Sequence, residues 1–123
     1  MRGLLIRQFW LDKIFQGKKT WEIRGSNTHI RGRIGLIRSG SGRVVGTCDL
    51  VGVEGPLSLA DLRRNVSKHM APLSELRKPL RYKQTYAWVL KNAKALRKSV
   101  PYKHPQGAVI WVKLADSVSR MVK

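Results

Sequence analysis

The sequence predicts an α+β fold: a small, mostly antiparallel β-barrel of about six strands, with an early helix and a mid-chain helical insert. The apolar segments are short, rich in β-branched and aromatic residues, and separated by turn residues. They follow one another in hairpin order, without the regular alternation of strands and helices that a doubly wound sheet requires. The chain has 123 residues, which suits one domain with one hydrophobic core.

The early helix is predicted between two strands. Residues 4–8 form a short apolar run typical of a strand, and residues 9–17 have aromatic and apolar residues at helical spacing. Gly17 occupies the position just past the expected helix end, where glycine is common. Residues 19–24 then alternate in the manner of a second strand.

The next two strands are expected on either side of a tight turn. Residues 25–28 read as a turn, and residues 31–39 predict a strand that ends at the turn formed by residues 40–42. Residues 43–53 predict a long strand. Its glycines at positions 46 and 52 indicate bulges or close contacts.

The segment from 56 to 83 has a different character and predicts the helical insert. Ser58 is suited to cap a helix, and Asp61 three residues later completes an approximate capping box. Residues 72–75 favour a second short helical turn, which ends before Pro79 because the residue preceding a proline avoids helical conformation.

The last part of the chain returns to strands. Residues 85–91 and 108–114 are apolar and aromatic, and residues 93–102 carry a weaker strand pattern between them. The prediction is therefore a single domain over residues 1–115. Residues 116–123 are expected to form a solvated, frayed C-terminal tail.

Charge is the strongest compositional signal. The chain has 25 Lys and Arg residues against 7 Asp and Glu residues, a formal net charge of +18 and a sequence pI of about 11.2. Such a chain attracts polyanions and gains affinity by releasing their counterions, so nucleic acid is the leading partner. No apolar run approaches the ~20 residues of a membrane span, and no basic amphipathic helix of useful length indicates a membrane surface. A single cysteine, Cys48, excludes an internal disulfide framework and fits a reducing cytoplasm.

The residues that could ligate a metal are widely separated. The cysteine and the three histidines, His29, His69 and His104, show no CxxC or HxxxH spacing, so no metal and no other cofactor is expected. Each histidine is expected to be a solvated loop residue. The sequence also lacks the GxSxG elbow and the spacing of a phosphate-binding loop.

The basic residues are interleaved with aromatic ones, a composition typical of surfaces that bind single strands or splayed bases. Trp88 and Trp111 lie among apolar strand residues and are expected in the core, whereas Trp21 and Tyr82 are equally suited to stacking on a base. Asp49 is expected to pair with a neighbouring arginine, and Cys48 to pack in the core. Ser39 and Ser41 read as turn residues near a cleft.

Four motifs, in order, resemble those of the ASCH domain family. "LLIRQFWLDKIFQGKKTWEIRG" is similar to the family's opening strand, its aromatic-bearing helix and its Gly-x-Lys-Thr-x-Glu-x-Arg motif, and "RGRIGLI" is similar to its second motif. "VVGTCDLVGV" and "YAWVLKNAKALRKSVPYKHPQGAVIWVKL" resemble its Gly-containing strand and its closing strands. The resemblance spans residues 4–114. It implies a PUA-like β-barrel fold that binds RNA in a cleft lined by Lys19, Glu22 and Arg24.

Some relatives of this family hydrolyse N4-acetylcytidine, and others cleave RNA. The amidohydrolases carry Lys-Thr-x-Thr and a later glutamate, whereas this chain keeps Lys19, has Glu22 in place of the second threonine, and offers Glu75 only as the nearest later acid. The missing hydroxyl speaks against the same mechanism. Glu22 would instead activate a water as a general base, or orient a ligand.

Three hypotheses follow from these observations. The first is a cytoplasmic binding module that holds nucleic acid, RNA in preference to DNA, in a basic cleft. The candidate contact residues are Lys18, Lys19, Trp21, Arg24, Arg31, Arg33, Arg38, Tyr82, Lys83 and Lys103. The second is a ribonuclease or nucleoside amidohydrolase with Lys19 and Glu22 as catalytic residues. The third is an adaptor for an acidic protein partner, and the oligomeric state is left open.

Overall fold

The structure, a computed structural model, describes residues 1–122 and contains one sheet of six strands. The strands are β1 (Arg2–Ile6), β2 (Trp21–Arg24), β3 (Gly32–Arg38), β4 (Arg43–Glu54), β5 (Tyr86–Pro101) and β6 (Trp111–Lys113). Their order across the sheet is β2-β5-β4-β3-β1-β6. Every neighbouring pair is antiparallel except β1 and β3, which are parallel.

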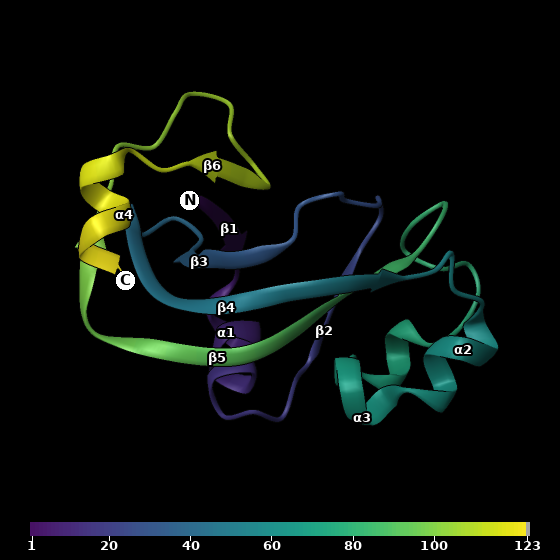
Figure 1. Ribbon diagram of the computed structural model, residues 1–123. Coiled ribbons are helices and arrows are strands. Elements are labelled where there is room, and N and C mark those ends of the chain that lie inside the picture. The colour runs from purple at the N-terminus through teal and green to yellow at the C-terminus, as the bar shows by residue number, and fades with distance from the viewer. Residues whose placement is uncertain (123) are drawn as a thin grey trace.

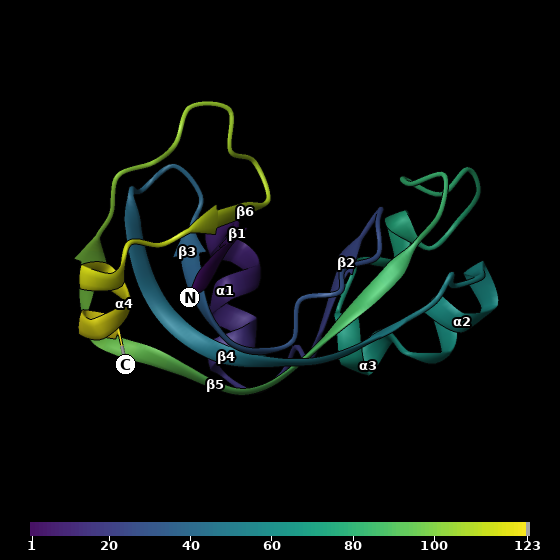
Figure 2. The same cartoon turned by 45° about the horizontal axis from the view of Figure 1, so that its top comes forward.

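The sheet curls into a half-barrel (Figures 1 and 2). The long strands β4 and β5 run side by side along the whole trough, and β2 extends the sheet only at one end. The predicted fold class, a mostly antiparallel and barrel-like sheet with an early helix and a helical insert, is confirmed.

The early helix, α1 (Gln8–Phe15), supplies the concave side of the core. Leu11 and Ile14 are buried against Leu36, Leu50 and Trp88 of the sheet. The helix ends in a Schellman motif in which the N–H groups of residues 17 and 18 donate to the carbonyls of residues 14 and 13. The φ angle of 76° at residue 17 is the left-handed conformation that this motif requires, as the glycine there predicted.

Gly46 allows β4 to pass close to this helix. A Cβ atom at residue 46 would lie 2.4 Å from the ring of Phe15 and 2.7 Å from the carbonyl oxygen of Lys94 on β5. The β4–β5 register shifts between Val44 and Gly46, which is the irregularity that a strand glycine predicts. This bend contributes to the curl that makes the trough.

Two segments differ from the sequence-based expectation. The segments expected as two strands, 85–91 and 93–102, form one strand, β5, which pairs with β4 near both of its ends and in the middle. Asn92, with a φ of 54°, is the residue of β5 in the left-handed conformation, and the β4–β5 register shifts at three places. The frayed tail expected from residue 116 onward is instead a helix, α4 (Asp116–Val122), whose Val122 is buried in a second core cluster with Val100 and Val112.

The helical insert contains α2 (Leu59–Arg64), α3 (Val66–His69) and a 3-10 turn, η1 (Leu73–Glu75). The capping box predicted at Ser58 is present, since the side chains of Ser58 and Asp61 each accept a hydrogen bond from the backbone of the other. The insert lies at the end of the half-barrel opposite α4, beside β2 (Figure 1). No helix within residues 1–122 is long and apolar enough to cross a membrane.

Candidate functional site

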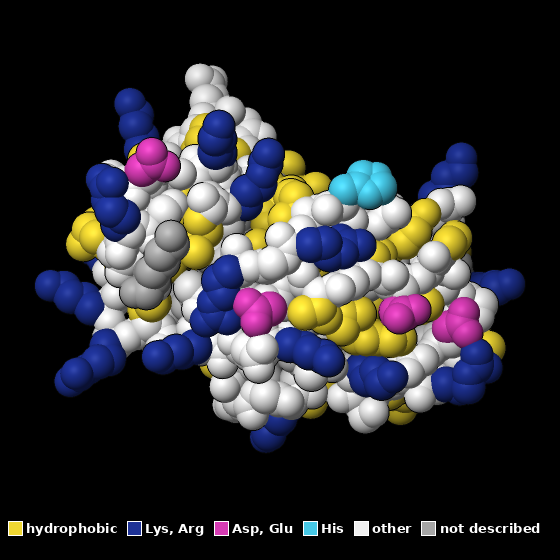
Figure 3. Space-filling model, viewed as in Figure 1, with side chains coloured by type: hydrophobic (Ala, Val, Ile, Leu, Met, Phe, Trp, Pro, Cys, Tyr) yellow, Lys and Arg dark blue, Asp and Glu magenta, His cyan; other side chains and the backbone are white. Residues whose placement is uncertain are grey.

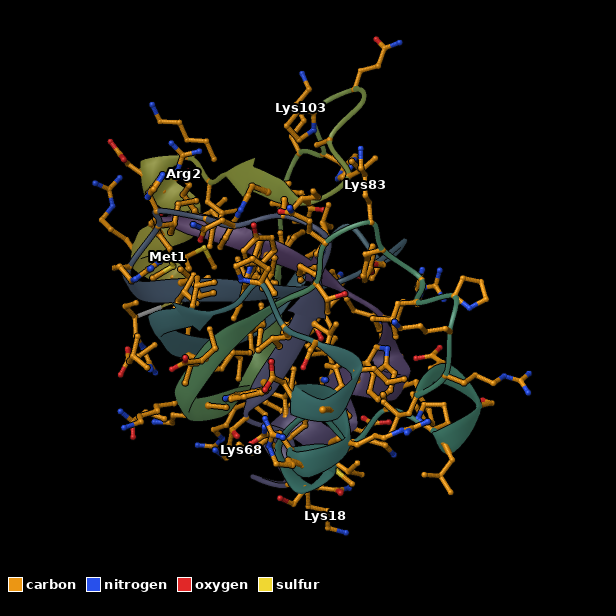
Figure 4. The ribbon with its side chains drawn as sticks, turned by 90° about the vertical axis from the view of Figure 1, so that its right-hand side faces the viewer. Met1, Arg2, Lys18, Lys68, Lys83 and Lys103 are labelled. Carbon is orange, nitrogen blue, oxygen red and sulfur yellow. The ribbon has the colours of Figure 1, made fainter. Side chains whose placement is uncertain are left out.

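A cavity of about 320 Å³ lies between β2 and the helical insert. Strand β2, the insert, β1 and α1 contribute to its wall, together with single residues that follow β3 and precede β5 and β6. The lining residues are Leu5, Arg7, Trp10, Lys19, Glu22, Ile23, Arg24, Ser39, Leu62, His69, Ala71, Glu75, Leu76, Leu80, Arg81, Tyr82, Thr85 and Val109. Figure 4 looks onto this end of the molecule, with Lys83 in its upper part and Lys18 and Lys68 in its lower part.

Lys19 lies in the wall of this cavity with only 3% of its surface exposed. Its Nζ donates hydrogen bonds to the carbonyl oxygens of Trp21, at 2.6 Å, and His69, at 2.7 Å, and lies 3.5 Å from Oε1 of Glu22. It also sits 4.5 Å from the ring centroid of Trp10, a cation–π distance. An ammonium group has three protons, so these three acceptors occupy its donor capacity.

Glu22 is the buried acid of the cavity, with 5% of its surface exposed. Its Oε2 accepts a hydrogen bond of 2.9 Å from Nη2 of Arg24, which also donates to the carbonyl of Leu5 at 2.8 Å. Successive β2 side chains point to opposite faces, so the two-residue spacing places Glu22 and Arg24 on one face. Two cations thus hold the carboxylate from the protein side.

Two features describe the charges of the cavity: the pKa of the buried Lys19 and the excess of cations over acids in the wall. Desolvation lowers the pKa of Lys19 from its usual value, and the negative charge of Glu22 acts in the opposite direction. The cavity wall carries four cationic side chains and two acids, namely Arg7, Lys19, Arg24 and Arg81 against Glu22 and Glu75. The site is therefore electropositive around one fixed carboxylate.

His69 joins the insert to this cluster and has no exposed surface. Its Nδ1 accepts a hydrogen bond from the N–H of Ala71 at 2.9 Å, so Nε2 carries the proton and donates to the carbonyl of Leu62 at 2.7 Å. Desolvation lowers the pKa of His69, which keeps the ring neutral. The expectation of a solvated loop histidine was wrong here, because the insert folds over residue 69; His29 and His104 are exposed.

Tyr82 lies against the backbone at the end of β2. A Cβ atom on Gly25 would come within 2.6 Å of the Tyr82 ring, so only glycine at this position leaves room for the tyrosine. The guanidinium carbon of Arg81 lies 5.4 Å from the same ring centroid. The pair supplies an aromatic surface and an exposed cation beside the buried cluster.

Of the residues predicted from the sequence, the structure brings Lys19, Glu22, Arg24 and Tyr82 to one cavity. Trp21 has 7% exposure and lies on the other side of β2, with Nζ of Lys68 5.0 Å from its ring centroid. Its ring is therefore covered by α3 and does not line the cavity.

The remaining predicted contacts lie outside the cavity wall. Arg31 donates to backbone carbonyls in its own loop, Arg33 pairs with Asp49 at 3.3 Å, and Arg38 donates to Gln8. The expected pairing of Asp49 with an arginine is thereby confirmed, as is the burial of Cys48. Three exposed lysines complete the predicted set: Lys18, Lys83 and Lys103.

Several lining residues had no signal in the sequence. Arg7 and Arg81 are far apart in the chain, and only the fold places both at one cavity. Trp10 was grouped only with the aromatic residues suited to stacking and was not assigned to the site, and Ser39 was interpreted first as a turn residue. The adjacency of Arg81 to Tyr82 in the chain is a local pattern that could have indicated a basic and aromatic rim.

Basic residues also cover the outer face of the half-barrel. Figure 3 shows Lys and Arg side chains spread over the face formed by β4 and β5, with acidic side chains and an apolar strip between them. Arg33, Asp49 and Asn92 form a hydrogen-bonded group there, which fixes part of this charge. Within residues 1–122 no group of three or more His, Cys, Asp and Glu side chains is arranged to hold a metal ion.

The six-stranded, half-barrel fold is shared with ASCH proteins of known structure. The sequence profile of the ASCH domain matches residues 4–100, and the chain belongs to the ASCH domain family. A search of curated proteins found no match.

Solved structures from Zymomonas mobilis show the same fold. The ASCH protein of that organism is 15% identical, covers 97% of this chain and 90% of its own, and superposes with a TM-score of 0.74. Its serine-to-alanine variant is 16% identical, with coverages of 98% and 92% and a TM-score of 0.73. Its tyrosine-to-phenylalanine variant is 15% identical, with coverages of 98% and 94% and the same TM-score of 0.73.

Proposed function

We propose that this ASCH domain binds single-stranded RNA and holds one unstacked nucleotide in the cavity between β2 and the helical insert. The observation that supports this most directly is the buried Lys19–Glu22–Arg24 cluster in a cavity whose exposed rim is basic and aromatic. A volume of about 320 Å³ lies at the lower end of the range of small-ligand sites in proteins. A long basic polymer-binding surface alone would need no such cavity.

The roles divide between rim and interior. Arg7 and Arg81 are exposed cations at the cavity and would contact phosphate oxygens, which gives affinity without sequence preference. Tyr82 would stack on the base, because aromatic rings accept any nucleobase face. Glu22, held by Lys19 and Arg24, would accept hydrogen bonds from the base edge.

The preference for RNA over DNA and the cytoplasmic location are parts of the same proposal. The first rests on the membership of the ASCH domain family, whose PUA-like fold is associated with RNA binding. The second rests on the free and buried Cys48, which fits a reducing compartment. Neither the RNA preference nor the location changes the role proposed for the cavity.

The test compares two arginine variants in fluorescence anisotropy titrations with a short single-stranded RNA, from about 50 to 200 mM salt. Arg81→Gln removes a rim cation, and Arg120→Gln removes a cation from α4 at the opposite end of the molecule. We expect Arg81→Gln to weaken binding and to lower the slope of log affinity against log salt by about 1, while Arg120→Gln has a smaller effect. A salt-independent affinity, or equal effects of both variants, would contradict the proposal.

A hydrolase is the second candidate, because a lysine with a lowered pKa shares the cavity with a carboxylate. In this function Glu22 would take a proton from the water that attacks the scissile phosphorus or amide carbon and would return it to the leaving oxygen or nitrogen as that bond breaks, while Lys19 would hold the carboxylate in place. The measurement is product formation from single-stranded RNA and from N4-acetylcytidine. Turnover that is lost in Glu22→Gln supports hydrolysis, and binding without turnover leaves RNA binding as the function.

A further inference from the structure

Building on the proposed RNA-binding function, we infer that the cavity selects guanine, with Glu22 and Arg24 facing the Watson–Crick edge of the base. The carboxylate, its two cationic partners and the apolar walls of the cavity carry this inference. Each of these features sets a separate chemical requirement for the ligand, and among the four RNA bases guanine satisfies the three requirements best.

The first requirement comes from the carboxylate. An ionised carboxylate is only an acceptor, with about four lone-pair positions on its two oxygens. The protein supplies Nζ of Lys19 to Oε1, at 3.5 Å, and Nη2 of Arg24 to Oε2, at 2.9 Å. Both oxygens therefore keep acceptor capacity toward the cavity that Glu22 lines. A ligand that fits this group must present hydrogen-bond donors, preferably two side by side.

The second requirement comes from the neighbouring cations. Lys19 and Arg24 carry one more positive charge than Glu22 can neutralise, so a cationic ligand gains little from entering. The donors of the ligand must belong to a neutral group. The guanidinium of Arg24 also places further N–H groups beside the carboxylate, which favour a ligand acceptor next to its donors.

Guanine offers this sequence of groups along one edge. Its 2-amino group and N1–H are adjacent donors, and O6 is the acceptor that follows them. Cytosine and adenine each present one amino donor followed by a ring acceptor, which would face the lone pairs of Glu22. Uracil presents a single N–H between two carbonyls. A buried polar group without a hydrogen-bond partner costs free energy. A mismatched base therefore loses hydrogen bonds and also leaves buried polar groups unpaired.

The third requirement comes from the walls. Leu62, Leu76 and Leu80 of the insert line the cavity. Aliphatic side chains contact the faces of a planar ring without competing for its polar edge. A flat, neutral ring with polar groups on one edge matches this combination, whereas a bare phosphate or a flexible charged chain would leave the apolar walls without a partner.

The experiment measures competition by unlabelled trinucleotides, identical except at the central base, against a labelled RNA bound to the wild-type protein. We expect central guanine to bind most tightly. Central inosine, which lacks only the 2-amino group, should bind about 10-fold more weakly, because one hydrogen bond to a charged acceptor is lost. Equal affinities for guanine and inosine, or a preference for uracil, would overturn the inference.

A second arm uses Glu22→Gln, with Asp49→Asn on β4 as the matched control for loss of an acid that pairs with an arginine. Glu22→Gln should abolish the difference in affinity between the guanine and inosine trinucleotides, and Asp49→Asn should retain that difference. Loss of the difference in both variants would contradict a direct contact between Glu22 and the base. Should Glu22→Gln fail to fold, the inosine comparison on wild-type protein still decides the inference.

The outcomes for the two proposals are distinct. Salt-dependent binding of all trinucleotides without a base preference overturns guanine selection and leaves RNA binding intact. Absence of salt-dependent binding to any of them overturns both. Guanosine monophosphate forms a separate arm: competition equal to that of the guanine trinucleotide supports guanine selection and shows that the polymer adds nothing.

Discussion

At the scale of single residues, Lys19 connects two parts of the chain that lie 50 positions apart. Its ammonium donates to the carbonyl of Trp21 on β2 and to that of His69 at the end of α3. Burial makes this charge costly, and Glu22 at 3.5 Å offsets part of that cost. Since its three protons already have acceptors in the protein, Lys19 acts through Glu22 as a positioning residue.

This role predicts a large difference between two adjacent lysines. Lys19→Met keeps the aliphatic stem but leaves two buried carbonyls without a donor and Glu22 with one cation fewer. We expect a loss of about 3–5 kcal/mol in the free energy of unfolding, measured by denaturant titration. Lys18→Met changes an exposed neighbour and should stay within about 0.5 kcal/mol of wild type. Similar effects of both substitutions would show that the buried ammonium does not hold the insert.

The sequence predicted part of this cluster, and the reasons are local. Glu22 and Arg24 are two residues apart on a strand, which places them on one face whatever the rest of the chain does. Trp21 was an open choice between stacking and packing, because its exposure depends on α3 covering it. Arg7 and His69 could not be assigned to the site, since their positions follow from how β1 and the insert pack around β2.

At the scale of elements, the insert and β2 form the two sides of the cavity. The backbone N–H of Thr20 donates to the carbonyl of Lys68, and Lys19 adds its bond to the carbonyl of the next residue, so α3 is fixed to the strand at two adjacent points. Arg63 of α2 donates to the carbonyl of Leu76, which ties the later part of the insert back to its first helix. The cavity therefore depends on the insert remaining docked.

The docking of α3 predicts a loss of stability in mild acid. The pKa of His69 is lowered from its ordinary value of 6.5, so the unfolded chain binds a proton below that pH which the folded protein does not. Stability should fall as pH drops below 6.5, by at most about 1.4 kcal/mol per pH unit for this one group, and level off at the folded pKa.

Chemical denaturation at pH values above and below 6.5 measures this dependence. The carboxyl groups with lowered pKa values, Asp49 and Asp61, have ordinary values of 3.8 and titrate below this window. His29→Gln changes an exposed histidine, so its free energy of unfolding should fall toward acid pH as in the wild type. His69→Asn should be less stable at neutral pH, and its free energy of unfolding should change less between neutral and acid pH. An acid loss of wild-type size in His69→Asn would contradict the assignment.

Element prediction was most accurate where local chemistry decides the structure. The end of α1 at Gly17 and the cap at Ser58 follow from motifs a few residues long, and both are present. The division of β5 into two strands was wrong, because pairing with β4 overrides the weak pattern of residues 93–102. The helix at 116–122 was missed because its short amphipathic pattern is stabilised by packing beside Val100 and Val112.

At the scale of the whole molecule, a net charge of +18 acts on nucleic acid over the entire surface, while the cavity acts at one end of it. The outer face of β4 and β5 is basic as well (Figure 3), so electrostatic attraction alone does not choose between the two surfaces. What distinguishes the cavity is a buried acid, apolar walls and an aromatic rim. In the proposed function, the general charge supplies affinity and the cavity supplies selectivity.

The most direct measurement is an NMR titration of the ¹⁵N-labelled protein with a short single-stranded RNA containing guanine. Binding in the cavity predicts that the amide shifts concentrate in residues 19–24 and 69–85, on its two sides, and saturate together. Glu22→Gln should reduce the shifts of residues 19–24 while the protein remains folded. Shifts confined to residues 91–98 of β5, with β2 unchanged, would place the RNA on the outer face and contradict the account.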